Sequence, residues 1–164
     1  MTIVKNQKEA DEYIISRNLN KSSQVNPNEL IILSQIEKLI TTYLKGTKLN
    51  LYEEILKLDV DLGIKDKFKT EFSQKVVNVL LNVKSGEITT YFNIGKKIQS
   101  KAFRAIGNVC KANPIPLIIP CHRVLRKNGE IGGFMGKSDK TWETSLKKTL
   151  LRIEGYKVKN SPYD

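Results

Sequence analysis

The chain has 164 residues, with 28 Lys and Arg against 17 Asp and Glu, so its formal net charge is +11. This length suffices for one substantial domain or two small ones. No run of about 18 apolar residues occurs and no basic-then-apolar signal opens the chain, so we expect a soluble, cytoplasmic protein. Two cysteines and one histidine are too few for a disulfide framework or a convincing metal site.

The positive charge is confined to one part of the chain. Residues 1–66 contain 9 Lys and Arg against 10 Asp and Glu, whereas residues 67–164 contain 19 against 7. A lysine-rich, merely soluble surface is one explanation. The asymmetry is also typical of a polyanion-binding module, such as one for DNA, joined to a neutral companion. It predicts a domain of residues 67–164 that binds DNA, and hence association with the nucleoid, after a small domain of residues 1–66.

The first domain is predicted to mix strands and helices. Thr2 to Val4 is β-prone, and Lys8 to Arg17 has apolar residues at helical spacing. Asn26-Pro27 supplies a cap and a first-turn proline for a clearer helix that ends at Gly46. Leu49 to Leu62 alternates apolar and charged residues, so we predict a strand or an extended linker there.

The second domain is predicted to be mostly helical. Helices are expected over Lys67 to Val83, over Tyr91 to Ile98 with Thr90 as the cap, and from a cap at Ser100 to Ala112. The last two are joined by a tight turn and have the pattern of a helix-turn-helix. Many enzymes contain similar helix pairs, so this pattern alone does not establish DNA binding.

The chemistry of the chain is concentrated between Pro114 and Val124. Three prolines exclude a continuous helix there, and they precede the only histidine, His122, which stands between Cys121 and Arg123. A thiol attacks as its thiolate, and the pKa of a thiol falls beside an imidazolium or a guanidinium. Cys121 is therefore a candidate nucleophile, and an inert buried cysteine is the alternative.

Glycines and a final helix follow this stretch. Four glycines in residues 129–136 let the backbone approach a ligand closely, but Ile131 stands where an ATP-binding loop needs glycine, which argues against that site. The final helix, with Asp139 as its cap, has apolar residues at a spacing that predicts Trp142 in the core. Glu154 ends this helix, where the helix dipole disfavours a carboxylate, so it is either solvated or kept for a function.

Several motifs occur in a characteristic order: Thr90-Tyr91, Lys101-Ala-Phe-Arg104-Ala-Ile-Gly107, Asn113-Pro114, Ile119-Pro-Cys-His-Arg-Val124 and Ile153-Glu154-Gly155. Together they resemble the O6-alkylguanine-DNA alkyltransferases, and the resemblance covers about residues 67–157. It implies an α+β fold, with a mostly helical, winged helix-turn-helix-like second domain and a first domain related to ribonuclease H but abbreviated here. It also implies a monomer that needs no cofactor.

The resemblance implies direct, irreversible DNA repair. Cys121 would keep the alkyl group of O6-alkylguanine, and also of O4-alkylthymine, from double-stranded DNA. His122 would act as the base through a water, with Glu154 orienting the imidazole, Asn113 bracing the turn and Tyr91 assisting departure of the base. The residues implied to bind the DNA or the flipped base are Tyr91, Lys101, Ala102, Arg104, Arg123, Val124, Phe134, Met135 and Gly136. Arg104 would fill the gap left by the flipped nucleotide.

The chain departs from the family pattern near the pocket. Phe134 and Met135 make it more apolar, residues 137–146 look like an insertion, and Lys137 is a candidate for a lysine that the family often has nearby. Three other functions remain open. They are a non-catalytic alkyltransferase-like lesion-binding protein, against which Cys121 argues, a helix-turn-helix regulator, and a cysteine hydrolase that turns over repeatedly.

Overall fold

The computed structural model describes residues 26–137 and 141–157. The chain divides into two compact units, Met1–Ser34 and Gln35–Asp164. The predicted elements at Thr2 to Val4 and Lys8 to Arg17, and the predicted cap Asp139, lie outside the described residues. The boundary predicted near residues 64–67 falls within the second unit, and the division into two functional domains stays a prediction.

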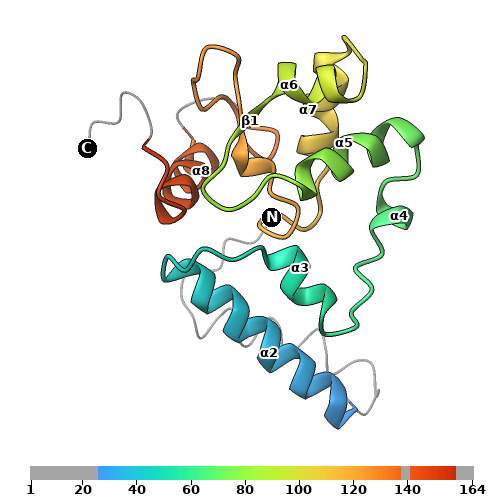
Figure 1. The fold of residues 1–164 in the computed structure, drawn as a ribbon, viewed down its shortest axis with the longest axis vertical. Coiled ribbons are helices and arrows are strands. Elements are labelled where there is room, and N and C mark those ends of the chain that lie inside the picture. Colours follow the sequence, from blue (N-terminus) through green and yellow to red (C-terminus); the bar gives the residue numbers. More distant parts are fainter. Residues whose placement is uncertain (1–25, 138–140, 158–164) are drawn as a thin grey trace. The chain divides into compact units, whose positions relative to one another are not determined.

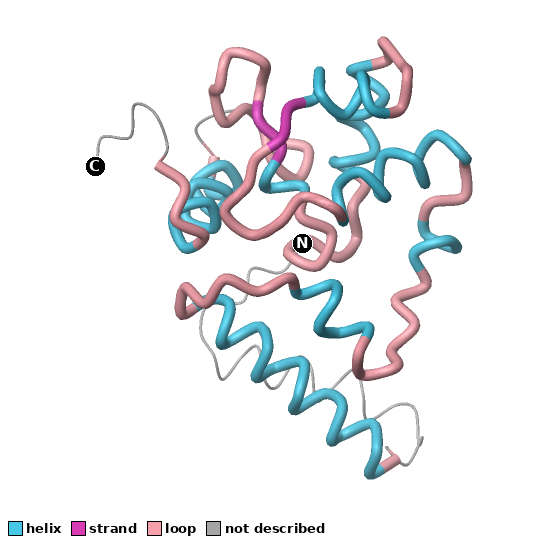
Figure 2. The backbone as a smooth tube through the Cα atoms, in the orientation of Figure 1, coloured by secondary structure: helices cyan, strands magenta, loops and turns pink. Residues whose placement is uncertain are grey.

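The described part of the chain is mostly helical, with one small parallel sheet (Figures 1 and 2). Strand β1 (Thr89–Thr90) pairs with β2 (Val124–Leu125), so that Thr89 lies opposite Val124. No helix among the described residues is long and apolar enough to cross a membrane. The helices are α2 (Pro27–Leu44), α3 (Leu51–Leu56), α4 (Ile64–Lys67), α5 (Glu71–Leu81), α6 (Tyr91–Lys97), α7 (Phe103–Lys111), the 3₁₀ helix η1 (Cys121–Arg123) and α8 (Trp142–Ile153).

Hydroxyl and amide side chains fix several helix starts. The Thr90 hydroxyl accepts from the Asn93 N–H at 3.1 Å, which confirms Thr90 as the cap of α6. The Asn26 side chain accepts from the N–H of Asn28 at 3.0 Å at the start of α2. Ser100 was wrongly predicted to cap α7, because its hydroxyl accepts from Ala102 within the turn and the helix begins only at Phe103.

Two other predicted elements are wrong. The segment from Leu49 to Leu62 contains helix α3, whose buried residues Leu51 and Ile55 stand four apart on one helical face. The single helix predicted over Lys67 to Val83 is broken between α4 and α5. Phe68 leaves helical geometry there, with φ of −119°, and its side chain is only 4% exposed. Burial of this ring therefore overrides the continuous apolar pattern.

The core lies where α5, α6 and α7 pack against one another (Figure 1). Its fully buried residues include Val76, Leu80, Ile94 and Ile106, and the same cluster continues to Ile119, Cys121 and Val124. Helix α8 contacts η1. The segment that carries the candidate nucleophile is therefore held by the hydrophobic core from one side and by α8 from another.

Helix α8 buries a face that is largely polar. Trp142, which was predicted to be in the core, is 64% exposed, so that prediction is wrong. The buried face instead carries Glu143, Thr144, Lys147, Leu150 and Leu151. The helix is oriented so that Lys147, in its middle, and Glu154, its C-cap, form buried polar contacts that are described below. This orientation leaves Trp142 facing outward.

The turn between α6 and α7 allows a sharp test of packing. A Cβ atom at Gly95 would lie 2.6 Å from the Ser100 carbonyl oxygen and 2.7 Å from the Phe103 ring, whereas one at Gly107 would meet nothing closer than 4.0 Å. We expect Gly95→Ala to lower the free energy of unfolding by about 1–3 kcal/mol. Gly107→Ala, the matched helical control, should be neutral or stabilising by up to about 1 kcal/mol. Urea denaturation measures both, and equal effects would contradict this account of the turn.

Candidate functional site

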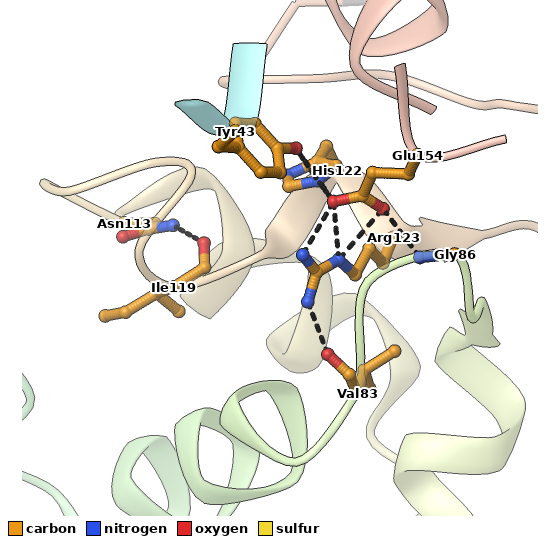
Figure 3. A network of polar contacts seen from close by, with 8 residues as sticks. All are labelled: Tyr43, Val83, Gly86, Asn113, Ile119, His122, Arg123 and Glu154. Carbon is orange, nitrogen blue, oxygen red and sulfur yellow. Dashed lines mark hydrogen bonds and ion pairs between the residues drawn. The ribbon is translucent and has the colours of Figure 1, made fainter. Parts of the chain in front are cut away.

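The turn that carries Cys121 is braced by Asn113. The Asn113 amide donates to the Ile119 carbonyl at 2.8 Å (Figure 3) and to the Cys121 sulfur at 3.1 Å, while its oxygen accepts from the Ile115 N–H at 3.1 Å. The prolines before the turn have no backbone N–H, so this stretch cannot form a continuous series of backbone hydrogen bonds. One amide side chain thus fixes both the backbone before the thiol and the thiol itself.

Glu154 is the centre of a buried polar network (Figure 3). It is the C-cap of α8 and 2% exposed. Its carboxylate accepts from the Tyr43 hydroxyl at 2.7 Å, lies 3.1 Å from His122 Nε2, and is 3.4 Å from the Gly86 N–H. Of the two alternatives for Glu154, a solvated helix end and a carboxylate kept for a function, burial excludes the first.

Arg123 forms the ion pair of this network. Its Nη2 donates to Glu154 Oε1 at 2.6 Å, its Nε lies 3.0 and 3.1 Å from the two carboxylate oxygens, and its Nη1 donates to the Val83 carbonyl. The side chain is 2% exposed. The expectation that Arg123 contacts DNA is therefore wrong for this structure, because its guanidinium is buried and bound to Glu154.

The network assigns the tautomer of His122. Burial alone would raise the pKa of Glu154, but hydrogen bonds from His122 and Arg123, together with the Arg123 charge, hold it at about 2, so the group is a carboxylate that only accepts. Nε2 of His122 must then carry the proton that it shares with Glu154. Nδ1 is left as a lone-pair acceptor, and it is fully buried with no partner among the described residues.

His122 is neutral in this state. Burial lowers the pKa of His122 from its ordinary value of 6.5, and the Glu154 carboxylate only partly opposes this effect. The imidazole therefore stays neutral at neutral pH, with its single proton on Nε2. A neutral imidazole with one free ring nitrogen can accept a proton, which is the property that a general base needs.

Cys121 differs from the sequence-based expectation. Burial raises the pKa of the Cys121 thiol, and the Asn113 hydrogen bond and the Lys147 charge only partly oppose the rise. The prediction that neighbouring His122 and Arg123 lower this pKa is wrong, since the imidazole is neutral and the guanidinium is bound to Glu154. The resting group is thus a protonated thiol, which becomes a nucleophile only when a base removes its proton.

A pocket of ≈ 160 Å³ opens next to Cys121. It is much smaller than the pockets of about 300–1,000 Å³ that take drug-sized ligands. Tyr91 lies in its wall, and burial raises the pKa of Tyr91 to about 12, so that its hydroxyl keeps its proton and can donate. The lining residues are Tyr91, Gly107, Cys110, Lys111, Cys121, Gly133, Phe134, Met135, Gly136 and Lys137.

One wall of the pocket is a tight turn from Phe134 to Lys137. These two residues exchange backbone hydrogen bonds of 2.9 and 3.0 Å, and both central residues have positive φ, 48° at Met135 and 79° at Gly136. This is the pattern of a type I′ turn. Gly136 suits this position because its φ is positive, and a Cβ there would also lie 2.6 Å from the Lys111 side chain, which would have to move. The two central residues of the turn, Met135 and Gly136, line the pocket.

Lys147 is a site residue that sequence reasoning missed. Its ammonium group is buried and donates to the carbonyls of Val124 at 2.6 Å, Ile131 at 2.7 Å and Gly133 at 3.4 Å. It therefore ties β2 to the glycine-rich segment that lines the pocket. Lys137, the lysine suggested from the sequence, does line the pocket and is exposed. The signal for Lys147 was its position seven residues before Glu154, two turns away on one helical face.

The remaining predicted residues fall into two groups. Lys101, Ala102 and Arg104 are exposed where α7 begins. Val124 is fully buried, does not line the pocket, and has its carbonyl bound to Lys147, so the structure does not bring it to the base-binding side. Within residues 26–137 and 141–157, no cluster of three or more possible metal ligands occurs.

The chain is similar in sequence to proteins of one family. The family model described as 6-O-methylguanine DNA methyltransferase, DNA binding domain, matches residues 71–156. Methylated-DNA--protein-cysteine methyltransferase of Saccharomyces cerevisiae is 39% identical over 88 residues, which are 53% of this chain and 44% of that protein. The protein of that name from Lodderomyces elongisporus is 31% identical over 155 residues, 87% of this chain and 74% of the relative. The chain thus spans less than half of the yeast relative and about three quarters of the other.

Solved structures agree with these matches. The O6-methylguanine-DNA methyltransferase of Pyrococcus kodakaraensis superposes with a TM-score of 0.55 at 32% identity, covering 73% of this chain and 62% of that one. Mycobacterium tuberculosis OGT in complex with DNA superposes with a TM-score of 0.56 at 29% identity, covering 74% and 65%. The family model covers more than half of the residues, from α5 through the buried carboxylate. This chain therefore belongs to the 6-O-methylguanine DNA methyltransferase family.

Proposed function

We propose that this protein repairs DNA by moving the alkyl group of O6-alkylguanine, and of O4-alkylthymine, onto Cys121. One observation carries the proposal most directly. A buried thiol opens into a small pocket, and the next residue is a neutral imidazole whose only unpartnered nitrogen is Nδ1. A thiol acceptor and a base of this kind are the minimum that transfer from an ether oxygen requires.

The step balances without a cofactor. The Cys121 proton passes through a water to His122 Nδ1, and the resulting imidazolium is stabilised by the Glu154 carboxylate at 3.1 Å. The thiolate forms a C–S bond as the bond between the alkyl carbon and O6 breaks, and the electron pair leaves with the base. The Tyr91 hydroxyl and the Met135 N–H donate hydrogen bonds to that base. Because the thioether has no bond that water cleaves readily, each protein acts once.

Double-stranded DNA is the proposed substrate, and α6 and α7 the proposed helix-turn-helix that binds it. Exposed Lys101, Ala102 and Arg104 stand together at the start of α7, in the half of the chain that holds the positive charge. A base inside a duplex cannot reach a buried thiol, so it must be flipped out, at a cost of a few kcal/mol. Arg104 offsets part of this cost by filling the vacated space. The winged form of this domain and an abbreviated, ribonuclease-H-like first domain are part of the same proposal.

Mass spectrometry of the intact protein tests the proposed function. After incubation with duplex DNA containing O6-methylguanine, the wild type should gain one methyl group and no more. Peptide mapping should place it on Cys121 rather than on Cys110. Cys121→Ala should bind the DNA and gain nothing. A lesion-binding protein or a regulator would leave the wild-type mass unchanged, and a hydrolase would return to its original mass and react again.

The pH dependence of transfer tests the roles of His122 and Cys121. The lowered pKa of His122 keeps the base form present down to and below pH 6.5, while the raised pKa of Cys121 keeps the thiol protonated up to and beyond pH 9.0. The rate constant for reaction with free O6-benzylguanine should therefore be flat between these values and fall only at lower pH. His122→Asn should instead react slowly, with a rate that rises about tenfold per pH unit, because only spontaneously ionised thiolate reacts. Matching profiles would contradict the base assignment.

Arg104→Ala tests base flipping. Transfer from duplex DNA should slow about tenfold or more, whereas transfer from free O6-benzylguanine should change by less than about threefold, because the free base needs no flipping. Lys101→Ala removes a neighbouring exposed charge. It should weaken DNA binding and the salt dependence of that binding, but at saturating DNA it should leave the transfer rates on both duplex DNA and free O6-benzylguanine unchanged. Equal losses on both substrates in Arg104→Ala would contradict the proposed role.

A further inference from the structure

Tyr43 belongs to the buried network but comes from α2, outside the residues 71–156 that the family model matches. Its side chain is 1% exposed. The hydroxyl oxygen lies 2.7 Å from Glu154 Oε1 and 3.3 Å from His122 Nε2 (Figure 3). A residue far away in the chain thus contacts both His122, the base of the proposed transfer, and Glu154, the carboxylate that orients it.

The direction of each hydrogen bond follows from the chemistry of the partners. Glu154 is a carboxylate and only accepts, so the single Tyr43 proton must point to Oε1. The lone pairs of the Tyr43 oxygen then face Nε2. Burial raises the pKa of Tyr43, with the Glu154 charge adding to the rise, so the hydroxyl remains neutral and keeps this role.

His122 Nε2–H is consequently flanked by two acceptors, the Glu154 carboxylate at 3.1 Å and the Tyr43 oxygen at 3.3 Å. Each of them favours the tautomer with the proton on Nε2. The carboxylate is in turn held by Tyr43 at one oxygen and by Arg123 across both. Loss of the hydroxyl removes one acceptor from Nε2–H and one donor from Glu154.

We infer that Tyr43 is a positioning residue for the alkyl transfer. Its hydroxyl holds Glu154 and His122 so that the imidazole proton stays on Nε2 and Nδ1 stays free to take the proton of Cys121. The inference rests on the proposed function for its rate effect, although the tautomer it predicts exists without any substrate. Helix α2 is then part of the reaction site through this one side chain.

A purely structural role makes a different prediction. Leu39, Ile40 and Leu49 pack against the same core cluster as Tyr43, and a ring that only fills space would need no hydroxyl. Tyr43→Phe would then leave the histidine unchanged. Under either role Tyr43→Phe removes one hydrogen-bond donor from the buried Glu154, so a change in stability does not separate the two roles.

The test uses the full-length protein and the variant Tyr43→Phe. His122 is the only histidine of the chain, so both ¹⁵N resonances of imidazole-labelled protein belong to it, and their couplings to the ring C–H protons distinguish Nδ1 from Nε2. The wild type should show a protonated Nε2 and an unprotonated Nδ1. In Tyr43→Phe the two resonances should move toward each other as the second tautomer becomes populated. The single-turnover rate on methylated duplex DNA should fall about tenfold, the effect of losing one hydrogen bond to a charged group, with unchanged DNA affinity.

Tyr52→Phe is the matched control. Tyr52 packs against the same cluster from α3, and the described part of the chain shows no hydrogen bond to its hydroxyl. It should leave both nitrogen resonances and the rate unchanged. The inference is overturned if wild-type His122 carries its proton on Nδ1, a measurement that needs no variant. It is also overturned if Tyr43→Phe leaves both nitrogen resonances unchanged, whatever its transfer rate. The same holds if Tyr52→Phe alters the resonances as much as Tyr43→Phe does. A wild type that accepts no alkyl group refutes the proposed function and leaves this NMR test intact.

Discussion

The structure depends on burying one carboxylate. Removing a carboxylate from water costs several kcal/mol unless donors replace the lost solvent. Glu154 is 2% exposed and meets this requirement with Arg123, Tyr43, His122 and the Gly86 N–H. Removing one partner of such a buried ion pair typically costs about 3–5 kcal/mol, because the other charge remains buried. The segments that supply these donors must therefore fold around the end of α8 together.

This constraint explains why the thiol and the imidazole are both neutral. The Glu154 carboxylate accepts the hydrogen bonds of Arg123, so this guanidinium, next but one to Cys121 in the sequence, is not left to ionise the thiol. Lys147 is the cation that lowers the pKa of Cys121, and burial outweighs it. A protonated thiol beside a neutral imidazole is less reactive toward adventitious electrophiles than a thiolate. Reaction then requires a substrate that fits the pocket and a proton transfer to His122.

The parts of the site that the sequence predicted are those with a local signal. Cys121 and His122 are adjacent, and Asn113 precedes a proline-rich turn. Glu154 ends a helix where the dipole disfavours a carboxylate, and Thr90 is the cap of α6. Each of these needs only neighbouring residues to be recognised. The resemblance to a family added their order, and the comparisons confirm that family membership.

The parts that the sequence did not predict depend on which face of a helix is buried. In α2 the apolar spacing directs attention to residues such as Leu44, yet Leu44 is 46% exposed and the buried side chain is Tyr43. In α8 the same reasoning placed Trp142 inside, and the tertiary contacts turned Lys147 inward instead. Arg123 likewise reads as a basic, DNA-facing residue until its partner 31 positions away is known. Periodicity identifies a helix, but polar partners decide its rotation.

A buried site in which one ring nitrogen, His122 Nδ1, is unpartnered among the described residues suits chemistry that happens once. An enzyme that turns over must release its product, and in many enzymes a mobile loop or lid opens for that step. The proposed transfer leaves a thioether on Cys121 and has no second step. The site can therefore be rigid. Its rigid parts are the polar face of α8, the Arg123–Glu154 ion pair, and the hydrogen bonds from Lys147 to the carbonyls of Val124 and Ile131. The small volume next to the thiol, ≈ 160 Å³, needs to receive one base and one alkyl group, and the alkyl group then stays bound to the sulfur.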